Sequence, residues 1–214
     1  MSIVVIGGHT RNIGKTSVVA GLIAALPHFH WTALKITQYG HGVCSANGEP
    51  CDCVTADHSL AVSEEKDRSG ESDTSRFLVA GADHSWWVRT QQGHLAEAMP
   101  RIRKILASTQ NVIIESNSIL HFIKPDLYLT VLDPQTADFK ASAQTFLDRA
   151  DAVLLHSLED SATPAWEQAS LKPVVDRPMF AINPPNYVTP EVIEFVRARL
   201  LSHHPVSQND QSKP

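Results

Sequence analysis

The chain has 214 residues, of which 43% are hydrophobic and 19% are charged, and its formal net charge is −5 at pH 7. These values are typical of an ordinary globular protein and exclude an intrinsically disordered chain. The acidic balance also argues against a protein that holds nucleic acid by electrostatic attraction.

Membrane association and export are not expected either. The longest apolar run, residues 18–26, is far too short to span a bilayer. The N-terminus leads directly into strand-like residues, without the basic segment and cleavage site of a signal peptide. Three cysteines in such a chain indicate reduced thiols. We therefore expect a cytoplasmic protein.

A phosphate-binding loop is predicted near the N-terminus. Residues 3–6 read as a buried strand, a glycine-rich turn follows, and Gly-Lys-Thr at 14–16 opens a helix. The main-chain N–H groups of such a loop cradle a polyphosphate, a lysine reaches the terminal phosphates, and a hydroxyl ligates Mg²⁺. The residues expected to bind the nucleotide are Gly8, His9, Thr10, Arg11, Asn12, Ile13, Gly14, Lys15, Thr16 and Ser17.

The spacing of this loop departs from the regular pattern. Five residues separate Gly8 from Gly14, whereas four would place the first glycine at position 9, where His9 stands. The five-residue spacing resembles the loop of dethiobiotin synthetase, which belongs to the same broad P-loop class as the nitrogenase iron protein and the nucleotide-dependent metallochaperones.

The next predicted strand, residues 31–37, carries a lysine at an apolar position. Lys35 would either snorkel to water from an edge strand or point into the cleft at the carboxyl end of the sheet. The resemblance to dethiobiotin synthetase, which has a lysine at a matching place, favours a catalytic role in the cleft.

A long polar connection is expected over residues 40–72, and it contains all three cysteines. Thiolates and imidazoles at this density could hold Zn²⁺ or another transition metal, although the spacing is not an established zinc pattern. Otherwise they are simply small and exposed loop residues. The residues of this candidate metal site are His41, Cys44, Cys51, Cys53 and His58.

Residues 72–82 predict a short helix that Ser72 or Asp73 caps and Gly81 ends. The stretch resembles the Lys-Asp-(Ser/Thr)-x-Arg…Ala-Gly-Ala segment of the molybdopterin-guanine dinucleotide biosynthesis protein B family, although that family's P-loop has the regular spacing. The resemblance implies that Asp73 and Arg76 contact a substrate. Helix capping and a surface ion pair are the alternative.

Residues 111–115 (Asn-Val-Ile-Ile-Glu) form a hydrophobic strand that ends in an acid, the Walker-B pattern. Glu115 is expected beside the P-loop, where it would hold Mg²⁺ together with Thr16 or activate the reacting group. A carboxylate that merely caps the next segment is the alternative.

Later elements bear on the choice of nucleotide. A strand over residues 150–156 lacks the Asn-Lys-x-Asp that reads guanine in GTP-specific relatives, so either ATP is used or guanine is read elsewhere. The loop after a last strand, residues 178–183, is where ATP-using relatives contact the base, which makes Asn183 a candidate.

Together these elements predict a three-layer α/β P-loop domain over residues 1–202, with a mostly parallel twisted sheet and a disordered tail over 203–214. Three functions remain open: a Mg²⁺-dependent ATP- or GTP-binding accessory protein of molybdenum-cofactor biosynthesis, an ATP-dependent ligase, and a nucleotide-switched metallochaperone. The first implies a pterin cofactor or its biosynthetic enzyme as partner. Relatives of this class suggest a homodimer.

Overall fold

The fold is described from a computed structural model that places residues 1–39, 60–157, 165–166 and 170–203. The strands are β1 (Ser2–Gly8), β2 (Trp31–Tyr39), β3 (Leu60–Glu64), β4 (His84–Gln91), β5 (Asn111–Glu115), β6 (Leu127–Leu132), β7 (Ala152–His156) and β8 (Met179–Ile182). The α-helices are α1 (Lys15–Ala25), α2 (Asp73–Val79), α3 (Leu95–Ala107), α4 (Ala141–Phe146) and α5 (Pro190–His203). Short 3₁₀ turns lie at Pro27–Phe29, Ser118–His121, Leu147–Arg149 and Lys172–Val174.

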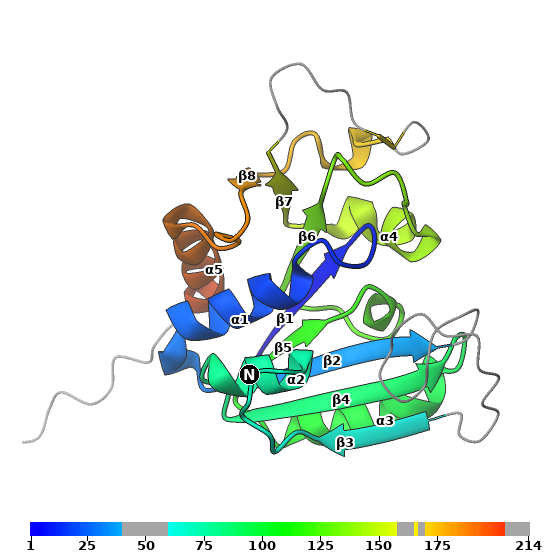
Figure 1. The fold of residues 1–214 in the computed structure, drawn as a ribbon, viewed down its shortest axis with the longest axis vertical. Helices are drawn as coiled ribbons and strands as arrows, with labels where there is room; N and C mark the ends of the chain where they lie inside the picture. Colours follow the sequence, from blue (N-terminus) through cyan, green and yellow to red (C-terminus); the bar gives the residue numbers. More distant parts are fainter. Residues whose placement is uncertain (40–59, 158–164, 167–169, 204–214) are drawn as a thin grey trace, which may run out of the picture.

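The eight strands in the described part of the chain belong to one sheet, in the order β3-β4-β2-β5-β1-β6-β7-β8 (Figure 1). Each pair of neighbours is parallel except β3 and β4, which run antiparallel at one edge. The P-loop strand β1 is therefore central, between β5 and β6. The carboxyl ends of β1, β2 and β5 meet at one edge of the sheet, which is where open α/β sheets bind ligands.

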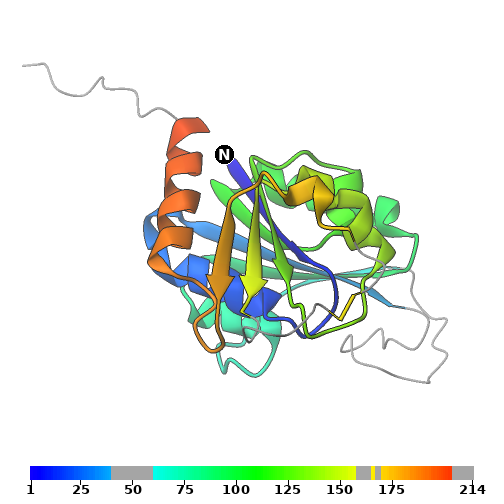
Figure 2. The same ribbon diagram turned by 90° about the horizontal axis from the view of Figure 1, so that it is seen from above.

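Helices cover both faces of the sheet, as Figure 2 shows. On one face, α1, α2 and α5 pack over a buried cluster that includes Val19, Phe77 and Val196. On the other, α3 and α4 pack over a second cluster that includes Ile102 and Phe146. The prediction of a three-layer α/β fold with a mostly parallel sheet is confirmed.

The local sequence explains most of these elements. Strands β1, β5 and β6 are almost entirely buried, and most of their residues are correspondingly apolar. Helix α3 places its apolar residues on one stripe that faces the sheet. Helix α2 begins where the Ser72 hydroxyl accepts a hydrogen bond from the main-chain N–H of Ser75, as the capping signal predicted.

One predicted segment differs from the structure. The connection expected over 40–72 contains strand β3, which pairs with β4 and extends the sheet at its edge. Strand β4 continues to Gln91, Gly93 then turns the chain with φ +85°, and α3 begins at Leu95. In the part of the chain that the structure describes, no helix has the length and apolarity needed to cross a membrane.

Candidate functional site

The loop between β1 and α1 ends at Gly14, which precedes the first turn of the helix. Gly14 has φ +88° and no side chain caps the helix, so the N–H groups of the first turn remain available to a ligand. Asn12 also has a positive φ, at +57°. The backbone therefore has the curvature of an anion-binding loop at the amino end of an eleven-residue helix.

Lys15 folds back over this loop. Its ammonium group donates a hydrogen bond to the main-chain oxygen of Thr10. The hydroxyl of Thr10 in turn donates to the Asp138 carboxylate, which lies in the segment after β6. Burial lowers the pKa of Lys15 from its ordinary value, and the nearby Glu115 carboxylate opposes that shift.

A cluster of charged residues lies beside the first turn of α1. The Thr16 hydroxyl donates to Glu115 Oε2 at 2.8 Å, and Lys35 Nζ lies 3.2 Å from Glu115 Oε1. Lys35 also donates to the Asp73 carboxylate and lies 3.5 Å from the Thr16 hydroxyl. Three elements, β2, β5 and α2, thus direct side chains toward the residue that follows the P-loop lysine.

Lys35 is charged in this cluster. Burial alone would lower the pKa of Lys35, but the carboxylates of Glu115 and Asp73 outweigh burial and raise it above its ordinary value. Only 19% of the Lys35 side chain and 8% of the Glu115 side chain is exposed, compared with 39% for Asp73. Lys35 is therefore not an edge lysine that snorkels to water, and it lies on the same side of the sheet as α1 and α2.

Arg76 joins the cluster from the second turn of α2. Its guanidinium donates to the Ser17 hydroxyl at 3.1 Å and lies 3.8 Å from the Asp73 carboxylate. Both candidate substrate residues of α2 are therefore brought next to the P-loop helix. Asp73 stands in the first helical turn, after the Ser72 cap.

His9 occupies the place where a regular P-loop has glycine, and it is fully buried. Its Nδ1 accepts from the Asp133 main-chain N–H at 3.4 Å, so its Nε2–H donates to the Thr136 carbonyl at 3.2 Å. The ring also packs against Phe139 and Trp166, at centroid distances of 5.1 and 5.0 Å. Burial lowers the pKa of His9, so the neutral ring anchors the P-loop to the segment after β6.

Asn117 supports the other side of the loop, and sequence reasoning missed it. Its side-chain oxygen accepts from the Gly8 main-chain N–H at 3.0 Å, and its Nδ2 donates to the Gly8 carbonyl at 2.8 Å. A Cβ atom at Gly7 would lie 2.1 Å from that Asn117 oxygen, so only glycine fits there. Its position two residues after the Walker-B acid was the available signal.

The loop after β8, which carries the predicted base-contacting residue Asn183, also reaches the P-loop. Asn183 is exposed and pairs with Asn186 through main-chain hydrogen bonds. The Tyr187 ring, in contrast, packs over Gly14, where a Cβ atom would lie 1.9 Å from it. His156, at the end of β7, lies against the same ring and hydrogen-bonds the Ile13 carbonyl at 2.9 Å.

The metal predictions fall on two different regions. Thr16 and Glu115 present oxygen atoms side by side, which are the donors that Mg²⁺ prefers. The candidate transition-metal residues His41, Cys44, Cys51, Cys53 and His58 lie outside the residues that the structure describes. Among the described residues, no group of three or more His, Cys, Asp or Glu side chains is arranged to hold a metal ion.

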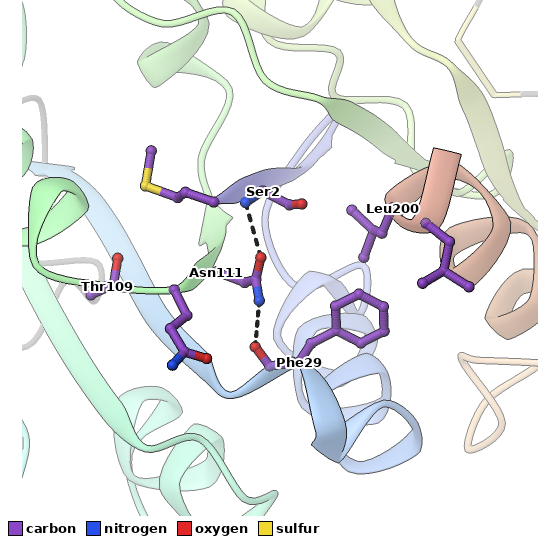
Figure 3. Close-up of a pocket in the computed structure, with 8 residues that line it drawn as sticks. Ser2, Phe29, Thr109, Asn111 and Leu200 are labelled. Atoms are coloured by element: carbon purple, nitrogen blue, oxygen red, sulfur yellow. Dashed lines mark hydrogen bonds between the residues drawn. The ribbon is translucent and has the colours of Figure 1, made fainter. Parts of the chain in front are cut away.

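A separate pocket of about 390 Å³ lies at the opposite end of the sheet, where β1 and β5 begin (Figure 3). Asn111 crosses its floor, accepting from the Ser2 main-chain N–H at 2.9 Å and donating to the Phe29 carbonyl at 2.6 Å. Leu200 and Leu201 line its other side. The hydrogen bonds that the figure draws join Ser2, Asn111 and Phe29, and the pocket lies at the end of the sheet away from the P-loop.

No protein-family model matches the chain, and no curated protein matches it. Among solved structures, HypB from Helicobacter pylori in complex with nickel has a TM-score of 0.47 and 14% identity, covering 93% of this chain and 85% of that one. LpxK from Aquifex aeolicus in complex with ATP has a TM-score of 0.47 and 16% identity, covering 85% and 53%. The 54 kDa signal recognition particle protein from Aeropyrum pernix in complex with GDP has a TM-score of 0.46 and 14% identity, covering 94% and 47%.

This chain thus spans about half the length of the last two proteins. At these identities and TM-scores, the likeness does not tell what the chain binds.

Proposed function

We propose that the chain binds a nucleoside triphosphate with Mg²⁺ at the loop of residues 8–17 and hydrolyses or transfers its terminal phosphate. The observation that carries the proposal is the hydrogen bond between Thr16 and Glu115. It joins the residue after the P-loop lysine to an acid at the end of the neighbouring parallel strand. A glycine turn needed only to connect β1 to α1 would not require this pair.

Each residue has a distinct part in the proposed reaction. The N–H groups around Gly14 and the amino end of α1 would hold the phosphates. Lys15 would leave the Thr10 carbonyl and pair with the terminal phosphates, whose negative charge grows during transfer. Thr16 and Glu115 would hold Mg²⁺, directly or through water, and the metal would supply charge neutralisation on the phosphate oxygens.

The accessory role in molybdenum-cofactor biosynthesis is the finer form of this proposal. Its support is the stretch from Asp73 to Ala82 and the overall strand order, which resemble the molybdopterin-guanine dinucleotide biosynthesis protein B family. In that role the partner would be a pterin cofactor or its biosynthetic enzyme, and the nucleotide would be GTP or ATP.

A second candidate, an ATP-dependent ligase, is favoured by the Lys35 cluster. Lys35 and Arg76 are cations beside the expected metal position, next to Thr16 and Ser17 respectively. Such cations can orient a carboxylate or carbamate for attack on the terminal phosphate. The third candidate, a metallochaperone, depends on residues 41–58, which the structure does not describe.

The test is calorimetric titration of ATP and of GTP, each with and without Mg²⁺, into the wild type and Lys15→Ala. We expect one nucleotide to bind with Mg²⁺ and Lys15→Ala to weaken binding at least tenfold, since it loses a charge-assisted contact. Lys124→Ala is the matched control, because Lys124 is exposed and precedes β6 at the far end of the sheet.

The Glu115→Gln variant separates the contribution of Mg²⁺ to nucleotide affinity from the contribution of the phosphate contacts. It keeps an oxygen to accept from Thr16 but removes the charge, so we expect the Mg²⁺-dependent part of the affinity to fall most. Preference for GTP would favour the accessory role, and preference for ATP with phosphate release only upon adding a small acid would favour the ligase. Folded wild-type protein that binds neither nucleotide would rule out the proposal.

A further inference from the structure

The segment after β6 holds a lysine next to the P-loop that the proposed reaction does not yet use. Lys140 donates its main-chain N–H to the His9 carbonyl at 2.9 Å, directly before α4. The packing of His9 against Phe139 and Trp166 fixes this segment against the loop. Lys140 is therefore held by the same residue that replaces the usual P-loop glycine.

The charge around Lys140 is not balanced. Its half-buried ammonium group and the exposed Arg11 guanidinium make no hydrogen bond or ion pair with any residue that the structure describes. Among the described residues, Asp138 is the one carboxylate that acts on Lys140, and it already accepts a hydrogen bond from the Thr10 hydroxyl. Burial, then repulsion from Lys15 and Arg11, lower the pKa of Lys140 to about 8.

A half-buried ammonium group such as that of Lys140 is costly beside like charges unless an anion joins it. Lys15 donates to the Thr10 carbonyl and Lys140 donates its main-chain N–H to the His9 carbonyl, so the two lysines are attached to consecutive residues of the loop. A ligand at the tip of Lys15 therefore lies beside the segment that carries Lys140. Lys35 serves the opposite side, toward β2 and α2, where two carboxylates already neutralise it. The positive charge that the described carboxylates leave unbalanced therefore lies on the side of the loop that faces the segment after β6.

We propose that Lys140 and Arg11 form an oxyanion subsite beside the terminal-phosphate end of the P-loop. This inference rests on the proposed nucleotide binding and deepens it. The shared chemistry is a phosphate or carboxylate group, which has two sources: the terminal phosphate of the nucleotide itself, or a separate anionic second substrate. In both cases the subsite lies opposite Lys35, so the transferred group is held from two sides.

The first test measures the titration of Lys140 by NMR of isotope-labelled lysine side chains, with the Lys140→Gln variant assigning the signal. An oxyanion at the subsite favours the charged amine, so the pKa of Lys140 must rise by about one unit or more when the subsite fills. The probes are Mg²⁺ with a non-hydrolysable ATP analogue, Mg²⁺-ADP alone, Mg²⁺-ADP with inorganic phosphate, and inorganic phosphate alone.

The two sources give different patterns. If the pKa of Lys140 rises with the ATP analogue but not with ADP, the terminal phosphate is the occupant of the subsite. A rise only when phosphate accompanies ADP identifies a separate anion. If the analogue and ADP both bind but no probe moves the pKa of Lys140, the subsite does not exist and the proposed nucleotide binding still stands.

Calorimetry with variants provides the second test. Lys140→Gln should weaken the anion-filled complex roughly tenfold or more while Lys140→Arg retains it, because a charge-assisted contact is lost only in the first. Lys124→Gln is the control and should bind as the wild type does. Equal binding by Lys140→Gln and the wild type would overturn the subsite. If the wild type binds no nucleotide, the NMR titration with inorganic phosphate alone decides. A rise in the pKa of Lys140 would still support the subsite, and an unchanged pKa would overturn it.

Discussion

Lys35 and Glu115 are register partners on the adjacent parallel strands β2 and β5, and Lys35 Nζ lies 3.2 Å from Glu115 Oε1. Because partners in register point to the same face of a sheet, the contact follows from the pairing itself. A protein cation therefore stands beside the acid proposed to hold Mg²⁺. Removing it leaves Glu115 and Asp73 without their shared neutralising charge.

Lys35→Met should destabilise the fold by about 1–3 kcal/mol, because it leaves a nearly buried carboxylate without its cation. The figure is below that of a fully buried pair because Asp73 is partly solvated. Urea denaturation at pH 7 measures it. Mg²⁺ without nucleotide should stabilise Lys35→Met more than the wild type, since the ion can replace the missing charge.

The control for Lys35→Met is Lys66→Met. Lys66 Nζ lies 2.5 Å from the Glu64 carboxylate, but 75% of the lysine side chain is exposed. An exposed ion pair of this kind contributes little, so the change should stay below about 0.5 kcal/mol. Equal losses in the two variants would contradict the assignment of a special role to the Lys35 cluster.

The Gly14→Ala substitution should lower the free energy of unfolding by more than backbone strain alone would. At φ +88° any side chain costs roughly 1–2 kcal/mol, and the new Cβ atom would also lie 1.9 Å from the Tyr187 ring. Gly81→Ala is the matched control, because its φ is +107° and its Cβ atom would meet nothing within 4 Å. Urea denaturation of both variants should give a clearly larger loss at Gly14.

A double variant separates the two causes at Gly14. In a Tyr187→Ala background the ring is gone, so the cost of Gly14→Ala should fall to that of Gly81→Ala. An unchanged cost would mean that the ring moves aside freely, and that the loop after β8 does not constrain the P-loop.

His9 should make the protein less stable in acid. Its folded-state pKa is lowered by burial, so between that value and about 6.5 the unfolded chain binds a proton that the folded chain does not. Stability from this group is complete above pH 6.5 and is lost as pH falls, at up to about 1.4 kcal/mol per pH unit. Urea denaturation at pH 7.5 and 5.5 measures the difference.

His9→Gln removes the titrating ring and should reduce this acid loss, although its stability at pH 7.5 will be lower because the aromatic packing is lost. His28→Gln, at an exposed position, should retain the wild-type dependence. If His9→Gln and the wild type lose the same stability between the two pH values, the source of any acid sensitivity lies elsewhere.

The sequence predicted the elements whose signals are local. Residues 111–115 read as a strand and form β5, and the Ser72 cap marks the start of α2. Strand β3 was missed because its five residues show little periodicity, and it is ordered by pairing with the longer β4. An edge strand of this kind depends on its partner more than on its own residues.

The sequence could predict the site residues that lie close together in the chain, but not the contacts between residues that are far apart in it. The loop itself, with Lys15 and Thr16, carries a pattern that spacing reveals. The bonds of Asn117 to Gly8 and the packing of Tyr187 over Gly14 join residues more than a hundred positions apart. No spacing rule relates such positions, so only the sheet order brings them together. Metal binding at the cysteines and the role of Asn183 remain predictions.

The place of β1 at the centre of the sheet has a consequence for how the chain acquires its fold. Ser2 pairs with Asn111, 109 residues later, and β1 pairs on its other side with β6. Strand β1 therefore lacks both neighbours until residues more than a hundred positions away in the chain have come to pair with it. Closing a loop of that length costs chain entropy before any pairing compensates for it, so the strand that leads into the P-loop depends on some of the slowest contacts of the fold to form.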